Sequence, residues 1–192
     1  MRNIKGFTLI ELLIVIGVLG ILAAGLLAAV DPFEQLKKGR DTNRRNIAVE
    51  LNNALIRYYA THGSLPWSGA SPICAMYTNG SAPVTMQALN NGNASSLDAT
   101  GCIQPLVDDG ELKQDYIAGV GTGDIAKYFI YSATGVDLSI CYEPESKSFY
   151  NDTATKWANS GASGFTDASA TTCTVANKKV NLGTGVCFWC AK

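Results

Sequence analysis

The chain has little of what enzymes and metal sites are built from. It holds one histidine in 192 residues, His62, so a histidine-dependent catalytic triad would have to use that residue. The sequence contains no glycine-rich phosphate loop, zinc-protease helix motif, serine nucleophile elbow or twelve-residue calcium loop. We therefore expect no enzymatic activity, no bound metal and no cofactor.

Charged residues are also sparse, at 16% of the chain, and the formal net charge is −1. This balance argues against a broadly cationic nucleic-acid binder, so nucleic acid is not expected as the main partner. Glycine, serine, threonine and asparagine are abundant after residue 60, which is typical of a loop-rich outer domain. The length beyond the N-terminal segment is enough for one domain with its own core.

The first 30 residues hold the strongest pattern in the chain. A short basic leader ends at Gly6, and an apolar run follows from Phe7 to Val30 with Glu11 as its single charge. A membrane span takes about 20 residues, whereas a secretory signal has a shorter apolar core and a cleavage site after it. The run therefore predicts a retained span. Because basic residues favour the cytoplasmic side, the rest of the chain is expected outside.

The helix of the span is expected to continue well beyond the membrane, with apolar residues at about helical spacing up to Tyr58. Asp31-Pro32 predicts a bend within this helix, because proline lacks a backbone donor and disfavours helix at the residue before it. Gly63 is suited to end the helix. The amphipathic part of the helix would thus cover residues 31–62.

The segment Lys5-Gly6-Phe7-Thr8-Leu9-Ile10-Glu11-Leu12 resembles the class III signal of the type IV pilin family, which includes the pseudopilins of type II secretion. The resemblance implies that a prepilin peptidase cuts between Gly6 and Phe7 and that Phe7 is then N-methylated. It implies four parts: a cleaved leader at 1–6, a transmembrane and filament-core helix at 7–30, its extracellular continuation at 31–62, and a globular head domain at 63–192.

A carboxylate within a span is costly, at about 2.5–3.5 kcal/mol in mid-membrane on insertion scales, so Glu11 needs a partner. After the implied cut, the amine of Phe7 lies four residues before it. Glu11 could pair with this amine of its own chain, which the helix geometry permits. It could instead pair with the amine of a neighbouring subunit and set the register between subunits, which is what the resemblance implies for assembly.

Six cysteines lie in the outer part of the chain: Cys74, Cys102, Cys141, Cys173, Cys187 and Cys190. Their even number indicates disulfides formed in an oxidising compartment, with 15 pairings open. One arrangement joins Cys74 to Cys102, Cys173 to Cys187 and Cys141 to Cys190. The spacing Cys187-Phe-Trp-Cys190 also fits a redox or zinc pair, but neither a thioredoxin-like context nor a second close pair is visible.

The rest of the chain also resembles the pilin family, which implies an α+β fold. In this fold the long N-terminal helix packs on an antiparallel β-meander, and the C-terminal part is loop-rich and tied by disulfides. Three strands are expected, at 127–132, 138–142 and 148–150, because these segments are aromatic and β-branched. A short helix ending at Gly110 is expected within 102–112. Residues 159–172 predict a loop, and residues 174–191 predict one or two further strands.

These features together predict a structural subunit of a type IV pilus-like filament used for surface attachment, motility or DNA uptake. The implied partners are identical or related pilin subunits, the prepilin peptidase, an inner-membrane assembly platform with its ATPase, and membrane lipid before assembly. Arg40, Arg44 and Arg45 are expected to pair between subunits. Two alternatives are a pseudopilin of a type II secretion or competence pseudopilus, and a singly anchored surface binding protein. An adhesive or DNA-capturing subunit would expose one of the tryptophans: Trp67, Trp157 or Trp189.

Overall fold

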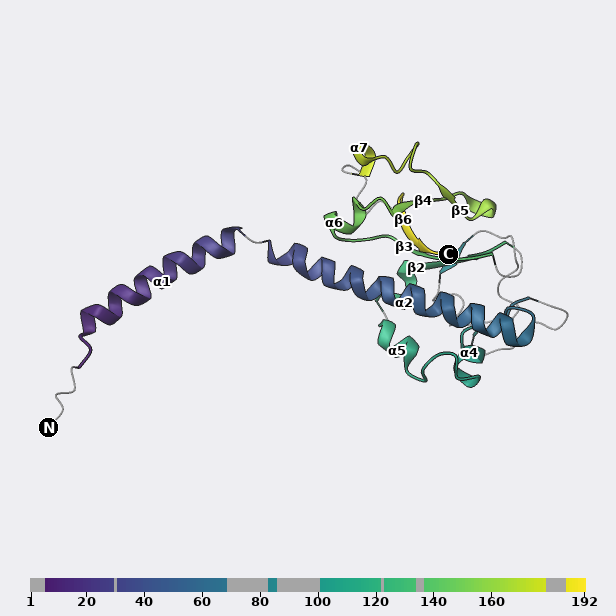
Figure 1. Ribbon diagram of the computed structural model, residues 1–192, viewed down its shortest axis with the longest axis horizontal. Coiled ribbons are helices and arrows are strands. Elements are labelled where there is room, and N and C mark those ends of the chain that lie inside the picture. Colours follow the sequence, from purple (N-terminus) through teal and green to yellow (C-terminus); the bar gives the residue numbers. More distant parts are fainter. Residues whose placement is uncertain are drawn as a thin grey trace. The chain divides into compact units, whose positions relative to one another are not determined.

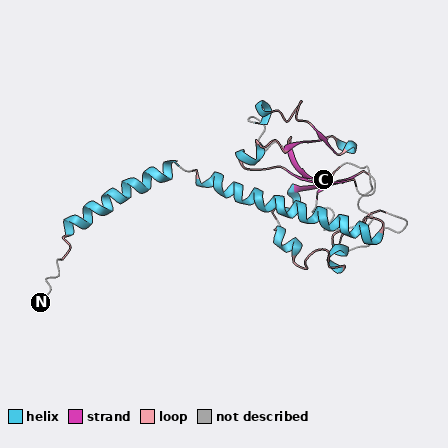
Figure 2. Ribbon diagram, in the orientation of Figure 1, coloured by secondary structure: helices cyan, strands magenta, loops and turns pink. Residues whose placement is uncertain are grey.

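The computed structural model describes residues 6–29, 31–68, 83–85, 101–121, 123–133, 137–178 and 186–192. The chain forms two compact units, Met1–Leu36 and Lys37–Lys192. Figure 1 labels the elements along the chain, and Figure 2 separates helices from strands.

Helix α1, Leu9–Ala29, makes up most of the first unit. Its segment Leu9–Leu27 is long and apolar enough to cross a membrane, with a mean hydropathy of 2.7, and none of that segment is buried. Large apolar side chains such as Ile10 and Leu26 are therefore exposed along it. The apolar run of the sequence thus forms one long helix without a covering partner in the described part of the chain.

Helix α2, Pro32–His62, is a separate element. The sequence predicted a bend within one continuous helix, whereas the structure divides the helix between Ala29 and Pro32. Asp31 gives the reason, because its Oδ1 accepts a hydrogen bond of 3.1 Å from the backbone N–H of Phe33 and so caps α2. Pro32 fits the first helical position, where its missing N–H costs nothing. Residue 31 therefore starts a new helix instead of bending an existing one.

Within the described residues of the second unit, six strands form one antiparallel sheet in the order β1-β2-β3-β6-β4-β5. The strands are β1 Val84–Thr85, β2 Tyr128–Ser132, β3 Leu138–Tyr142, β4 Thr155–Asn159, β5 Phe165–Asp167 and β6 Phe188–Ala191. The predicted strands at 127–132 and 138–142 are confirmed as β2 and β3. The strand β6 follows β4 and β5 in the chain but lies between β3 and β4.

One face of the sheet packs on α2. The helix buries Ala48, Leu51, Leu55 and Tyr58, which recur at the three- and four-residue spacing of one helical face. Alternate residues of the strands meet them in a single core, among them Tyr128, Ile130, Ile140, Tyr142 and Trp189. In Figure 1 the sheet lies along one side of α2, and the short helices α4 (Gln104–Asp108) and α5 (Tyr116–Val120) lie along the other.

The opposite face of the sheet carries a smaller aromatic core. Tyr131, Phe165 and Phe188 are buried there, and Phe129 packs against them. The rings of Phe165 and Phe188 meet edge to face at a centroid distance of 5.2 Å. Both faces of the sheet are therefore covered near β2, β3 and β6, which follows from apolar residues occupying consecutive positions in these strands.

Two predictions about the C-terminal half were wrong. Residues 148–150 form part of helix α6, Lys147–Tyr150, because the Ser146 hydroxyl accepts a hydrogen bond from the Phe149 N–H and caps a helical turn. The predicted loop at 159–172 contains a 3-10 turn, Gly161–Ser163, and strand β5. By contrast, the predicted glycine helix ends are confirmed, with φ of 71° at Gly63 and 76° at Gly110.

Candidate functional site

The start of α1 forms a reciprocal hydrogen-bonded turn between Thr8 and Glu11. One carboxylate oxygen of Glu11 accepts from the Thr8 backbone N–H at 2.9 Å and from the Thr8 hydroxyl at 2.8 Å. The Thr8 hydroxyl oxygen in turn accepts from the Glu11 N–H at 3.3 Å. This is the capping-box arrangement, in which the residue before a helix and the third residue within it satisfy each other's free N–H groups.

The capping box is a feature that the sequence reasoning missed. That reasoning considered only amine partners for Glu11, yet the spacing Thr8-Leu-Ile-Glu11 is the sequence signal of a capping box and would have predicted it. The box leaves the charge of Glu11 in place while orienting its carboxylate back toward residue 8. The preceding residues of the predicted cleavage site, Gly6 and Phe7, are exposed and lie outside regular secondary structure.

A second charged cluster lies in the other unit and fixes α2 to the sheet. Arg44 is 2% exposed, and its Nη2 donates to Asp124 Oδ1 at 2.7 Å and to Glu145 Oε1 at 2.8 Å. Lys127 Nζ reaches the same two carboxylates at 2.9 Å each. Burial alone would lower the pKa of Arg44, but these hydrogen bonds outweigh it and raise the pKa, so the guanidinium stays charged.

The carboxylate of Asp41 completes the cluster from the same helix. It is fully buried, lies 3.6 Å from Arg44 Nη1, and accepts from the backbone N–H of Ser146 at 2.7 Å and from that of Glu145 at 2.9 Å. It therefore binds two free N–H groups at the start of α6. The charges of this cluster come from α2 and from two segments about 80 to 105 residues further along the chain.

The expectation that Arg40, Arg44 and Arg45 pair between subunits is wrong for Arg44 and stays a prediction for Arg40 and Arg45, which also have contacts within the chain. Arg44 is buried within its own chain, and Arg40 binds Glu145 at 3.0 Å. The guanidinium of Arg45 lies 4.6 Å from the centre of the Trp189 ring, in a cation–π contact. The acidic partners lie far away in sequence, so the arginine-rich stretch alone could not reveal them.

The tryptophans considered for ligand contact are mostly covered. Trp67 is 4% exposed and Trp189 is 9% exposed, since both belong to the main core. An open groove of about 520 Å³ runs beside α2, and its lining includes Trp189 with Arg45, Glu50 and Arg57. Because Glu50 contributes negative charge, and because Arg57 already binds Glu111, the groove is not the basic channel that base stacking would require.

Two of the three disulfides considered from the sequence are present, Cys141–Cys190 and Cys173–Cys187. Cys102 is also disulfide-bonded. Cys74 lies outside the described residues, so the predicted Cys74–Cys102 bond stays a prediction. Because Cys187 and Cys190 bond to different cysteines, they form neither a redox pair nor a zinc pair. The cysteines therefore tie β6 to β3 and the C-terminal loop to itself.

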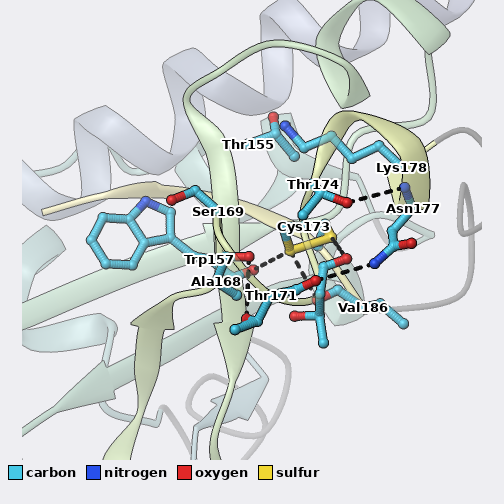
Figure 3. Close-up of a disulfide and its surroundings, with 12 residues drawn as sticks. Thr155, Trp157, Ala168, Ser169, Thr171, Cys173, Thr174, Asn177, Lys178 and Val186 are labelled. Atoms are coloured by element: carbon cyan, nitrogen blue, oxygen red, sulfur yellow. Dashed lines mark hydrogen bonds between the residues drawn. A yellow bond between two sulfur atoms is a disulfide. The ribbon is translucent and has the colours of Figure 1, made fainter.

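The loop closed by Cys173–Cys187 is held further by polar side chains (Figure 3). Asn177 Nδ2 donates to the Thr171 carbonyl at 3.1 Å. Lys178 is only 3% exposed, and its Nζ donates to the Asp152 carbonyl at 2.6 Å. Burial lowers the pKa of this ammonium. These contacts fix the C-terminal end of the short helix α7, Val175–Lys178, and the Cys173–Cys187 disulfide lies just before its start.

Comparison with known proteins adds evidence for the N-terminal segment. The family described as the prokaryotic N-terminal methylation motif matches residues 1–27. Fimbrial protein EcpC of Eikenella corrodens is 34% identical over 101 residues, which cover 50% of this chain and 65% of that protein. No solved structure matches the chain. Residues 1–27 therefore match a prokaryotic N-terminal methylation motif, a class III signal, and they precede an α+β domain of pilin-like arrangement.

Proposed function

We propose that the chain is a structural subunit of a type IV pilus-like filament, with no chemistry of its own. It is made with the leader 1–6, cut between Gly6 and Phe7 by a prepilin peptidase, methylated on Phe7 and polymerised through α1. The similarity to a fimbrial protein supports this role. So does the exposed apolar surface of α1, which in water would have to be covered by lipid or by other subunits.

The position of Glu11 is the observation that carries the assembly role. Glu11 is the one charged residue in α1, and the capping box holds its carboxylate at the helix N-terminus beside the amine that the cut would create on Phe7. The box supplies hydrogen bonds but no positive charge. A neighbouring subunit's amine would supply that charge and fix the register of α1 against α1, in a low-dielectric core where such a pair is strong.

Two substitutions separate the charge of Glu11 from its capping role. Glu11→Gln keeps a side chain that can serve in a capping box but removes the charge. Thr8→Val removes the capping hydroxyl but keeps the charge. We expect Glu11→Gln to abolish filaments in the sheared cell-surface fraction while leaving cleavage intact, and Thr8→Val to retain more filament than Glu11→Gln. If Glu11→Gln assembled as well as the unmodified chain, charge pairing would be wrong.

Mass spectrometry of the sheared fraction tests processing. A chain that begins at methylated Phe7 is the expected result. A chain that still begins at Met1, or one cut after Val30, would contradict the proposed cleavage. A correctly processed chain that stayed in the membrane fraction and formed no fibre would favour the alternative of a singly anchored surface binding protein.

A further inference from the structure

Two tyrosine hydroxyls donate to one stretch of α2, and the ring of a third tyrosine packs beside one of them. Tyr142 Oη donates to the Asp41 carbonyl at 3.1 Å, and Tyr116 Oη donates to the Ile47 carbonyl at 2.9 Å. The third ring, Tyr128, lies opposite Tyr142 in the pairing of β2 with β3, with ring centroids 6.2 Å apart. Tyr128 is fully buried in the same core. Its hydroxyl has no hydrogen-bond partner among the residues that the structure describes.

The stretch of α2 between those two carbonyls carries Arg44. Its Nη2 serves Asp124 and Glu145, and its Nη1 faces Asp41 at 3.6 Å. Its Nε–H has no hydrogen-bond partner in the described part of the chain, although the side chain is 2% exposed. Tyr128 and Arg44 therefore both carry unsatisfied buried polar atoms. Burial raises the pKa of the Tyr128 hydroxyl and the positive charge of Arg44 acts against that rise, which places the two groups at one buried junction. Leaving both unsatisfied would cost about 1–3 kcal/mol for each group.

We propose that this junction binds one ordered water molecule, which accepts from Arg44 Nε–H and hydrogen-bonds to Tyr128 Oη. A bridging water satisfies both groups at once, as buried waters do when two or more polar partners surround them.

The charges around the junction favour water over an anion. Arg40, Arg44 and Lys127 are matched by the carboxylates of Asp41, Asp124 and Glu145, so the cluster is already neutral. An anion at Arg44 Nε would face those three carboxylates in a place of low dielectric, where like charges repel strongly. A small neutral molecule that both donates and accepts hydrogen bonds meets no such repulsion.

The site can be tested on the full chain in detergent micelles by NMR. The Arg44 Nε–H resonance should show a rotating-frame cross-peak to water in chloride-free buffer, and chloride should not shift it. The proposal is overturned if the resonance shows no water contact, or if it shifts with chloride because an anion occupies the site. This measurement needs no substitution and so does not depend on how a variant folds.

The direction in which a substitution shifts the melting temperature gives an independent test. With a bridging water, Tyr128→Phe removes a hydrogen-bonded hydroxyl, and the melting temperature should fall by about 2–5 °C. Without one, the substitution removes an unsatisfied buried hydroxyl, and the melting temperature should stay the same or rise, which would overturn the proposal. Tyr142→Phe is the calibration, because it removes a direct bond to the Asp41 carbonyl and lowers the melting temperature in either case.

Discussion

Replacing Arg44 by methionine should destabilise the second unit strongly. Methionine fills much of the same volume but leaves the fully buried Asp41 carboxylate without its cation. Removing one partner of a buried ion pair costs about 3–5 kcal/mol. For a domain of this size, 1 kcal/mol corresponds to about 2–4 °C, so the melting temperature should fall by about 6–20 °C.

The full chain in detergent micelles suits this measurement, because all three tryptophans belong to the second unit and report its unfolding by fluorescence. Arg40→Met is the matched control. Arg40 also binds Glu145, but its side chain is 57% exposed, and exposed pairs contribute about 1 kcal/mol or less. If Arg44→Met shifted the melting temperature no more than Arg40→Met, the assignment of the buried cluster as the anchor of α2 would be refuted.

Acid should weaken the same anchor. Burial raises the pKa values of the Asp124 and Glu145 carboxyls, but hydrogen bonds from Arg44 and Lys127 outweigh burial, so both pKa values are lowered in the folded chain. The two carboxylates therefore stabilise the fold at neutral pH, and this stabilisation is lost as the pH falls through their lowered pKa values. When melting temperatures are recorded from pH 7 downward, they should begin to decrease once the pH is below about 4.5. Glu145→Gln should make the melting temperature depend less on pH in this range, and an unchanged pH dependence would contradict the assignment. Gly164→Ala should cost about 2–4 kcal/mol in urea unfolding, because φ is +70° and a Cβ would lie 2.2 Å from the Tyr131 ring. Gly161→Ala, with φ of +64° and no atom within 4 Å, should cost only about 1–2 kcal/mol, and equal losses would show that the ring contact is unimportant.

Local sequence patterns predicted the features that depend on neighbouring residues. The long apolar helix α1, the glycine helix ends and strands β2 and β3 all follow from periodicity or composition within a few residues. The division at Asp31 was also encoded locally, since aspartate before proline is a strong helix start. The sequence reasoning weighed the disruption by Pro32 and overlooked the capping by Asp31.

The features that sequence reasoning missed depend on distant partners. Phe149 and Tyr150 are aromatic and favour a strand, yet the Ser146 cap and the Asp41 carboxylate, which lies 105 residues away in sequence, hold the segment as a helical turn. The role of Arg44 likewise rests on Asp124 and Glu145, at separations of 80 and 101 residues. No periodicity connects such positions, so only the folded chain shows them.

The place of β6 in the sheet has a consequence for the order of biogenesis. Because β6 joins β3 to β4 but is synthesised after β4 and β5, the two halves of the sheet stay apart until residues 188–191 arrive. Cys141 and Cys173 emerge before either of their native partners, Cys190 and Cys187. An oxidant that acts on the emerging chain at that stage finds Cys141 and Cys173 without their native partners, and any other bond that either of them forms must be undone by thiol–disulfide exchange. Correct maturation therefore favours oxidation that waits for the whole domain.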